Sequence, residues 1–239
     1  MALRSVTYQG HSYDISYDII GEGPTLVVLH GWGSNKEVMK SAFAKVPGFR
    51  YLFVDMPGFG KSSEPPKPLT TRDYAAIVES FLEALHVPKE IVMGHSFGGK
   101  VATLLSPRLL VLLSSAGIVE PKPLKVRLKI ALFKALKPFG GAKLRNLFVA
   151  RDAKDVSEVM YQTFKNVVDE DFRSTFAAFS GQALIFWGEE DRATSLASGQ
   201  EIAKLISKSR FFPLGGDHYF FLRHAPFIIQ TIRQEYEKL

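Results

Sequence analysis

The chain has 239 residues and no cysteine, which excludes disulfides, thiol nucleophiles and cysteine-based metal sites. Its hydrophobic content of 46% suffices for one compact domain, and no apolar run approaches the roughly 18 residues that a membrane span needs. The net charge of +6 is uneven: residues 120–154 carry ten Lys and Arg against two acidic residues, which leaves −2 on the remainder. Because the first residues do not resemble a signal peptide, we expect a cytoplasmic protein.

Short β-rich segments alternate with helical ones, which predicts an α/β fold with a mostly parallel sheet and helices on both faces. Residues 3–8 and 12–20 alternate polar and apolar side chains around Gly10 and predict an antiparallel N-terminal hairpin at one edge. Buried strands are predicted at 26–29, 50–54, 89–93, 109–113, 183–187 and 209–214. Helices are predicted at 36–46, 71–86, 97–105, 195–207 and 219–237.

The alternation is interrupted between the strand that ends at residue 113 and the strand that begins at residue 183. The intervening segment has helical patterning and no convincing strand, and a structureless loop of about 65 residues is improbable in a compact domain. We therefore predict a single domain over residues 1–239, with a helical lid inserted at residues 118–182.

The stretch Gly94-His95-Ser96-Phe97-Gly98 lies between a predicted strand and a predicted helix. In that context G-x-S-x-G is typical of a nucleophile elbow, where glycines permit a tight turn and the serine is presented at the end of the strand. The N-terminus of the following helix favours negative charge nearby. Ser96 is therefore a candidate nucleophile, and a serine nucleophile needs a base and a group that orients that base.

Two histidines follow Ser96 along the chain. His218 lies in a glycine-rich loop after a predicted strand, where its side chain can project over the strand ends, whereas His224 falls within the last predicted helix. We therefore predict that His218 is the base. The loop after the preceding strand offers three carboxylates, namely Glu189, Glu190 and Asp191.

These motifs resemble those of the α/β-hydrolase superfamily, in particular its serine-nucleophile members with a helical lid. Members commonly show G-x-x-D after this strand and G-G-x-H before the last helix; Gly188 with Asp191 and Gly215 with His218 match these patterns. The resemblance implies that Asp191 is the acid, with Glu190 as the alternative. The chain departs from the family between residues 99 and 109, where the helix and its connection are shorter than usual.

The elbow and the resemblance together imply an oxyanion hole. One backbone N–H comes from Phe97, the residue after the nucleophile, and the segment His30-Gly31-Trp32-Gly33 resembles the family's H-G-x-G, which makes Trp32 the second donor. His30 is expected to bond its own loop and His95 to pack or bond locally. No metal site and no cofactor are expected.

We expect a hydrolase that cleaves a carboxylic ester or a related small-molecule acyl substrate through Ser96, Asp191 and His218, with an acyl-enzyme intermediate and a small or medium aliphatic acyl group. Carbon–carbon bond hydrolases of the ring-cleavage type share the triad, but they typically have Asn before the serine and Trp after the histidine, where this chain has His95 and Tyr219. Acyl transfer to an acceptor other than water stays open, as does a non-catalytic ligand-binding or interaction protein on the same fold.

The basic segment raises the question of partners. Its apolar residues recur at helical spacing with lysines between them, which favours a lid helix with its apolar side on the pocket and its lysines in solvent. The alternative is a docking surface for an anionic partner, either an acyl carrier protein or an anionic lipid. No recognised nucleic-acid-binding motif is present, and the sequence does not indicate an oligomeric state.

Overall fold

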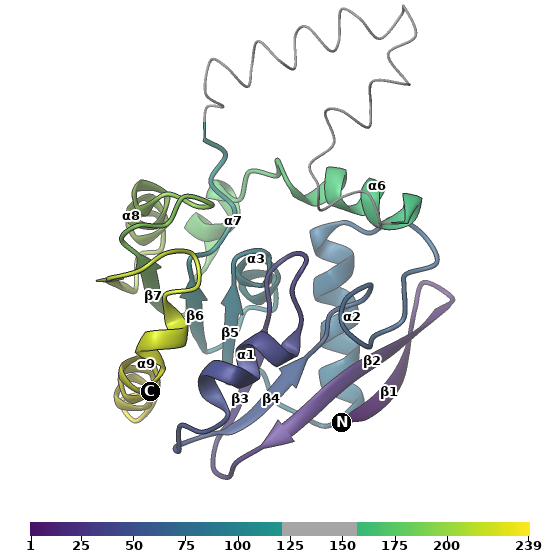
Figure 1. Ribbon diagram of the computed structural model, residues 1–239, viewed down its shortest axis with the longest axis horizontal. Helices are drawn as coiled ribbons and strands as arrows, with labels where there is room; N and C mark the ends of the chain where they lie inside the picture. Colours follow the sequence, from purple (N-terminus) through teal and green to yellow (C-terminus); the bar gives the residue numbers. More distant parts are fainter. Residues whose placement is uncertain (121–156) are drawn as a thin grey trace, which may run out of the picture.

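The computed structural model describes residues 1–120 and 157–239, which form one eight-stranded sheet (Figure 1). The sheet order is β1-β2-β4-β3-β5-β6-β7-β8. The strands are β1 (Ala2–Tyr8), β2 (His11–Ile20), β3 (Thr25–Leu29), β4 (Arg50–Val54), β5 (Ile91–His95), β6 (Leu109–Leu113), β7 (Gln182–Gly188) and β8 (Ser209–Leu214). β2 pairs antiparallel with both β1 and β4, and every other neighbouring pair is parallel. The predicted mostly parallel sheet with an antiparallel N-terminal hairpin is confirmed.

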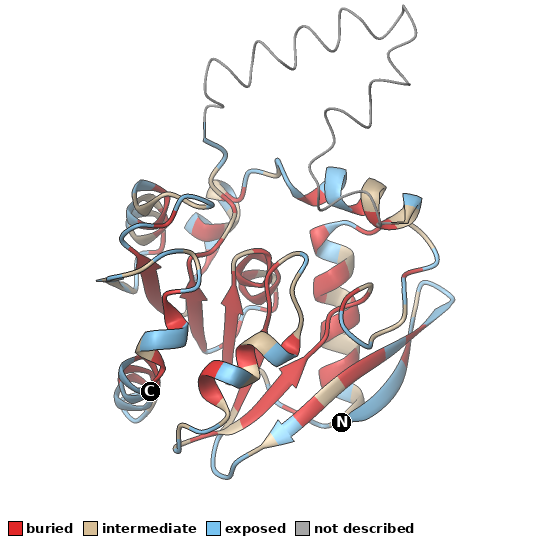
Figure 2. Ribbon diagram, in the orientation of Figure 1, coloured by how far each residue is buried: buried red, intermediate tan, exposed pale blue. Residues whose placement is uncertain are grey.

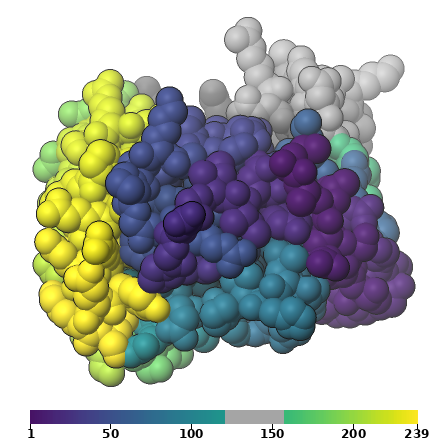
Figure 3. Space-filling view, turned by 90° about the horizontal axis from the view of Figure 1, so that it is seen from below, coloured from purple at the N-terminus to yellow at the C-terminus, as the bar shows by residue number. Residues whose placement is uncertain are grey.

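Helices cover both faces of this sheet. The described helices are α1 (Lys36–Phe43), α2 (Thr71–Ala84), α3 (Phe97–Leu104), α6 (Glu158–Val167), α7 (Arg173–Ala178), α8 (Leu196–Leu205) and α9 (Phe221–Tyr236). One apolar core lies between the sheet and α1 with α9, and the other lies between the sheet and α2, α3 and α8. Figure 3 shows α9, in yellow, beside the blue segment that contains α1. The rings of Phe43 and Phe221 stack between these two helices with centroids 5.9 Å apart.

The central strands are apolar throughout because neither of their faces meets solvent. Every residue of β5 and β6 is buried, as the red central strands of Figure 2 show. This is the pattern expected of parallel strands with helices on both sides. β2 instead alternates buried and exposed positions over part of its length, as an edge hairpin with one solvated face should.

Some element boundaries differ from the predicted ones. α1 ends at Phe43 instead of residue 46, and the chain turns after it, with the Val46 N–H donating to the Phe43 oxygen at 3.0 Å. α9 begins at Phe221 instead of residue 219, since the Asp217 side chain accepts the Tyr219 N–H and the chain turns there. β5 continues to His95, two residues beyond its predicted end, so the strand leads directly into Ser96.

Two described helices, α6 and α7, belong to the segment predicted as a lid. Figure 1 shows α6 at the end of the sheet toward which β5, β6 and β7 point. Residues 121–156, which include most of the basic segment at 120–154, lie outside the described residues. The lid and its anionic partner therefore stay predictions. None of the described helices has both the length and the apolar character that a membrane crossing requires.

Candidate active site

Ser96 stands at the junction of β5 and α3, where the backbone is strained. Its φ of 51° and ψ of −116° lie in a region that residues with a side chain rarely adopt. The residue caps the N-terminus of α3 without a side-chain hydrogen bond to the helix. Its hydroxyl therefore stays available, and it lies at the end of a helix that favours negative charge.

The glycines around Ser96 are required by the closeness of other backbone segments. A Cβ at Gly94 would overlap the backbone oxygen of Gly98. A Cβ at Gly98 would lie 2.5 Å from the backbone oxygen of His30, at the end of the neighbouring strand β3. Both outer positions of G-x-S-x-G must therefore be glycine for the elbow to pack against the sheet.

The predicted acid and base lie side by side at the ends of β7 and β8. The Oδ2 atom of Asp191 is 2.7 Å from Nδ1 of His218. Oδ1 of Asp191 accepts the backbone N–H groups of Ala193 and Thr194, at 2.8 Å and 3.0 Å. Asp191 thus receives hydrogen bonds on both of its oxygens.

These hydrogen bonds set the protonation of the pair. Burial acts to raise the pKa of Asp191, but the hydrogen bonds from His218 and from the Thr194 backbone outweigh it and hold that pKa at about 2. The carboxylate is therefore ionised at neutral pH, and Nδ1 of His218 must carry the hydrogen that it accepts. In the neutral imidazole this leaves a free lone pair on Nε2, the nitrogen a general base uses.

The structure does not bond Ser96 to His218. Within residues 1–120 and 157–239, Oγ of Ser96 forms no hydrogen bond. The two segments are nevertheless neighbours, because Nε2 of His95, the residue before the serine, lies 3.0 Å from the backbone oxygen of His218. Catalytic hydrogen bonds are often long in free enzymes and tighten when substrate binds.

The alternative acid and base lie elsewhere. Glu190 is exposed, and its backbone N–H donates to the oxygen of Gly216. His224 is a half-buried residue of α9 whose Nε2 donates to the backbone oxygen of Gly215. Neither side chain lies in the arrangement that joins Asp191 to His218.

The two predicted oxyanion donors have unused backbone N–H groups. Phe97 is the first residue of α3 and so has no acceptor within the helix. No described residue accepts a hydrogen bond from the backbone N–H of either Phe97 or Trp32. The Trp32 ring packs against Phe59, Phe97 and Phe164, with centroids 4.9, 5.6 and 5.4 Å away.

His30 has the structural role expected of it. Its Nε2 accepts the backbone N–H of Met56 at 3.0 Å, so Nδ1 carries the hydrogen and donates to the oxygen of Gly31 at 2.8 Å. Burial lowers the pKa of His30 to about 4, so the ring is neutral. His30 thereby holds the loop that carries Trp32 against the loop after β4.

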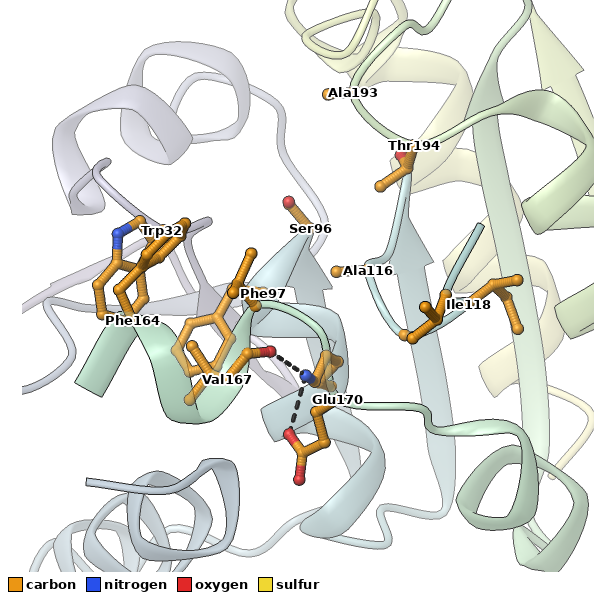
Figure 4. Close-up of a pocket in the computed structure, with 14 residues that line it drawn as sticks. Trp32, Ser96, Phe97, Ala116, Ile118, Phe164, Val167, Glu170, Ala193 and Thr194 are labelled. Carbon is orange, nitrogen blue, oxygen red and sulfur yellow. Dashed lines mark hydrogen bonds and ion pairs between the residues drawn. The ribbon is translucent and has the colours of Figure 1, made fainter. Parts of the chain in front are cut away.

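A cavity of about 260 Å³ opens beside Ser96 (Figure 4). In Figure 4 Trp32 and Phe164 lie on one side of the serine and Thr194 on the other. The apolar lining residues include Phe97, Ile118, Val119, Phe164, Val167 and Val168, of which the last three come from α6 and its end. A second cavity, of about 600 Å³, also borders Trp32 and is lined by Phe59, Met160 and Tyr219 among others.

Lys100 is a residue of this site that the sequence analysis did not single out. Its side chain is buried, its Nζ donates to the backbone oxygen of Val167 at 2.7 Å, and it forms an ion pair of 2.9 Å with Glu170. Both contacts are dashed in Figure 4. The one signal in the sequence is a lysine one helical turn after the elbow, in an otherwise apolar helix. Among the described residues, no group of three or more His, Asp or Glu side chains is arranged to hold a metal ion.

Comparisons with known proteins agree with this architecture. A model of the alpha/beta hydrolase family matches residues 26–230. The AB hydrolase superfamily protein YisY of Bacillus subtilis is 29% identical over 81% of this chain and 84% of its own length. A pimeloyl-[acyl-carrier protein] methyl ester esterase of Vibrio vulnificus is 25% identical over 92% of this chain and 94% of its own. The esterase EaEST of Exiguobacterium antarcticum superposes with a TM-score of 0.74 at 23% identity, over 94% of this chain and 96% of its own. The predicted fold is confirmed.

Proposed function

Because the chain belongs to the alpha/beta hydrolase family, we propose that it is a serine esterase whose catalytic triad is Ser96, His218 and Asp191. The observation that carries this proposal is the 2.7 Å hydrogen bond between Nδ1 of His218 and the ionised carboxylate of Asp191. In the neutral imidazole this bond leaves a lone pair on Nε2 of His218, on a loop that is bonded to the residue before Ser96.

Acylation begins with proton transfer from Ser96 to Nε2 of His218. Oγ attacks the ester carbonyl carbon, and the negative charge that develops on its oxygen is held by the backbone N–H groups of Trp32 and Phe97. Asp191 stabilises the imidazolium that forms. His218 then returns the proton to the departing alkoxide, and the alcohol leaves behind an acyl group bonded to Ser96.

Deacylation repeats these steps with water. Nε2 of His218 removes a proton from the water, the hydroxide attacks the acyl carbon, and the proton passes to Oγ of Ser96 as the carboxylic acid leaves. All of the chemistry in this scheme is performed by side chains and backbone groups of this chain.

The cavity beside Ser96 supports a small or medium aliphatic acyl group. Its volume of about 260 Å³, lined by described residues, has room for such a group beside the serine. Since a relative is named for the methyl ester of an acyl group on a carrier protein, we also propose that this enzyme accepts esters of carrier-bound acyl chains. The cytoplasmic location and the docking of such an anionic carrier on residues 120–154 remain predictions.

The test is hydrolysis of a p-nitrophenyl ester series, from acetyl to dodecanoyl, by the wild type and by Ser96→Ala. We expect the substitution to lower kcat by about 10⁶-fold, as loss of the nucleophile does in other serine hydrolases. The matched control is Ser41→Ala, which removes an exposed hydroxyl on α1 that donates only to the backbone oxygen of Val38. The control should keep wild-type activity, and the wild type should prefer short or medium acyl chains.

Two results would contradict the proposal. Equal ester hydrolysis by the wild type and Ser96→Ala would remove the serine mechanism. Absence of hydrolysis over the whole series would point to carbon–carbon bond substrates first, and then to a binding protein on this fold.

A further inference from the structure

His95 connects the loop of the proposed base to the strand of the proposed nucleophile. It is the last residue of β5, it immediately precedes Ser96, and its side chain is buried. Its Nε2 lies 3.0 Å from the backbone oxygen of His218. Since a carbonyl oxygen only accepts hydrogen bonds, Nε2 must carry the hydrogen and donate it.

The remaining nitrogen of His95 faces the oxyanion loop. With the hydrogen on Nε2, Nδ1 carries a lone pair, and it is buried without a hydrogen-bond partner among the described residues. A Cβ placed on Gly31 would lie 3.0 Å from this Nδ1 and 3.2 Å from Cβ of Ser96. The imidazole therefore packs between the loop that carries Trp32 and the loop that carries His218.

Aromatic rings fix the plane of this imidazole. The His95 ring centroid is 4.6 Å from that of His218, 4.9 Å from that of Phe221 and 5.3 Å from that of Tyr219. Burial lowers the pKa of His95 to about 3, so the ring stays neutral while His218 acts as a base. At neutral pH the ring therefore carries one hydrogen, and that hydrogen lies on Nε2.

The bond from His95 differs in direction from the other hydrogen bonds of the His218 loop. The other hydrogen bonds of residues 214–220 are of two kinds. Some have partners in the loop after β7, such as the bond from the Glu190 N–H to the Gly216 oxygen, and the others lie within the turn and the helix that follow. They place the base relative to its acid. In the described part of the chain, the bond from His95 is the one that joins this loop to β5 and so to the nucleophile.

We propose that His95 is a positioning residue that sets the separation of Ser96 and His218 by donating Nε2–H to the backbone oxygen of His218. The inference rests on the proposed serine mechanism. Because no described hydrogen bond joins the serine to the base directly, the two groups depend on their backbones for alignment. A displacement of about 1 Å in a reacting group can cost on the order of 100-fold in rate.

The test compares three substitutions, His95→Gln, His95→Asn and His95→Leu, with the fastest p-nitrophenyl ester as substrate. The amide nitrogen of Gln reaches the position of the imidazole Nε2, that of Asn ends one bond short, and Leu fills space without a donor. We expect Asn and Leu to lower kcat by about 100-fold with KM changed less than about threefold, because the substrate cavity is untouched. Gln should recover most of the wild-type kcat.

The opposite pattern would overturn the proposal. If His95→Leu kept the wild-type kcat, or if Gln and Asn lost the same amount, packing and not the donated hydrogen bond would be the role of His95. Should Leu fail to fold, as monitored by circular dichroism, the comparison of Gln with Asn decides alone. Ser96→Ala, measured in parallel, distinguishes failure of the serine mechanism from failure of the positioning role. If Ser96→Ala still hydrolyses the ester, the serine mechanism is wrong. If Ser96→Ala is inactive and His95→Asn is fully active, the positioning role alone is refuted.

Discussion

The proposed acid and base lie on loops that follow neighbouring strands of the sheet, whereas part of the wall of the cavity beside Ser96 comes from the helix α6. Asp191 and His218 follow β7 and β8, and hydrogen bonds to both oxygens of Asp191 fix their geometry. The α6 wall is held by side-chain contacts, among them those of Lys100 with Val167 and Glu170 at its C-terminal end.

This difference predicts two kinds of mutational effect, one on the chemical step and the other on substrate binding and stability. Groups on the strand ends keep their positions as long as the sheet is intact, so a change there should alter the chemical step. The C-terminal end of α6 depends on buried polar contacts with α3, so a change at those contacts should alter substrate binding and stability. The predictions below test this separation.

Beyond the loss of the serine itself, the largest effect is expected from Asp191→Asn. The carbonyl oxygen of Asn can still accept the backbone N–H groups of Ala193 and Thr194, which turns its NH₂ group toward Nδ1 of His218. Nδ1 must then accept, the hydrogen moves to Nε2, and the base is lost. Kinetics should show kcat lowered by about 10⁴-fold at neutral pH, with a well-folded protein.

The control for this substitution is Glu190→Gln, one residue away and exposed. It should leave kcat within about twofold of wild type, because surface substitutions away from special features have small effects. A large loss from Glu190→Gln together with a small loss from Asp191→Asn would assign the acid to Glu190.

A smaller effect, on binding and stability, is expected from Lys100→Met. The substitution removes the donor to the oxygen of Val167 and leaves Glu170 without its cation, so the end of α6 loses its attachment to α3. Urea denaturation should show a loss of about 2 kcal/mol in the free energy of unfolding, the scale of a charge-assisted hydrogen bond. KM should rise by about tenfold while kcat changes less.

Lys165→Met is the matched control, since it makes the same change at an exposed position of α6 itself. It should alter neither KM nor stability appreciably. If Lys100→Met lowered kcat by 100-fold at unchanged KM, the wall and the chemistry would not be separate.

A separate prediction concerns stability in acid and leaves turnover at neutral pH aside. Burial lowers the pKa of His30, which lies near Asp55 and Lys36, to about 4, and burial lowers the pKa of His95, which faces His218, to about 3. Between pH 6.5 and about 4 the unfolded chain binds protons on these histidines that the folded chain does not. The free energy of unfolding should therefore fall as pH drops, by about 1.4 kcal/mol per pH unit for each histidine.

His95→Gln isolates one of these contributions. Its free energy of unfolding, measured by urea denaturation from pH 7 to pH 4.5, should fall less steeply with decreasing pH than that of the wild type, by about 1.4 kcal/mol per pH unit. Parallel curves for the two proteins would mean that His95 titrates normally in the folded state.

The strands and the elbow could be predicted from local signals combined with one rule of topology, whereas the choice of Asp191 as the partner of His218 came from the resemblance to the α/β-hydrolase superfamily. Buried strands appear as short apolar runs, and the carboxyl ends of parallel strands meet at one edge of the sheet. Gly94 and Gly98 mark the tight turn on either side of Ser96, and the loops after β7 and β8 carry the proposed acid and base.

What the sequence could not predict are contacts between distant segments. His95 bonds a residue 123 positions later, and Lys100 bonds Val167, 67 positions later. Neither pair has a local pattern, since tertiary packing alone brings the partners together. The end of β5 at His95 was also missed, because glycine and histidine are not typical strand residues.

The most direct test of the central claim is to treat the protein with a fluorophosphonate and map the modified peptide by mass spectrometry. A fluorophosphonate phosphonylates a serine that a neighbouring base has activated. We predict one adduct, on Ser96, that is absent from Ser96→Ala and forms far more slowly in His218→Ala. An adduct on another residue, or equal labelling of the wild type and His218→Ala, would contradict the proposed triad.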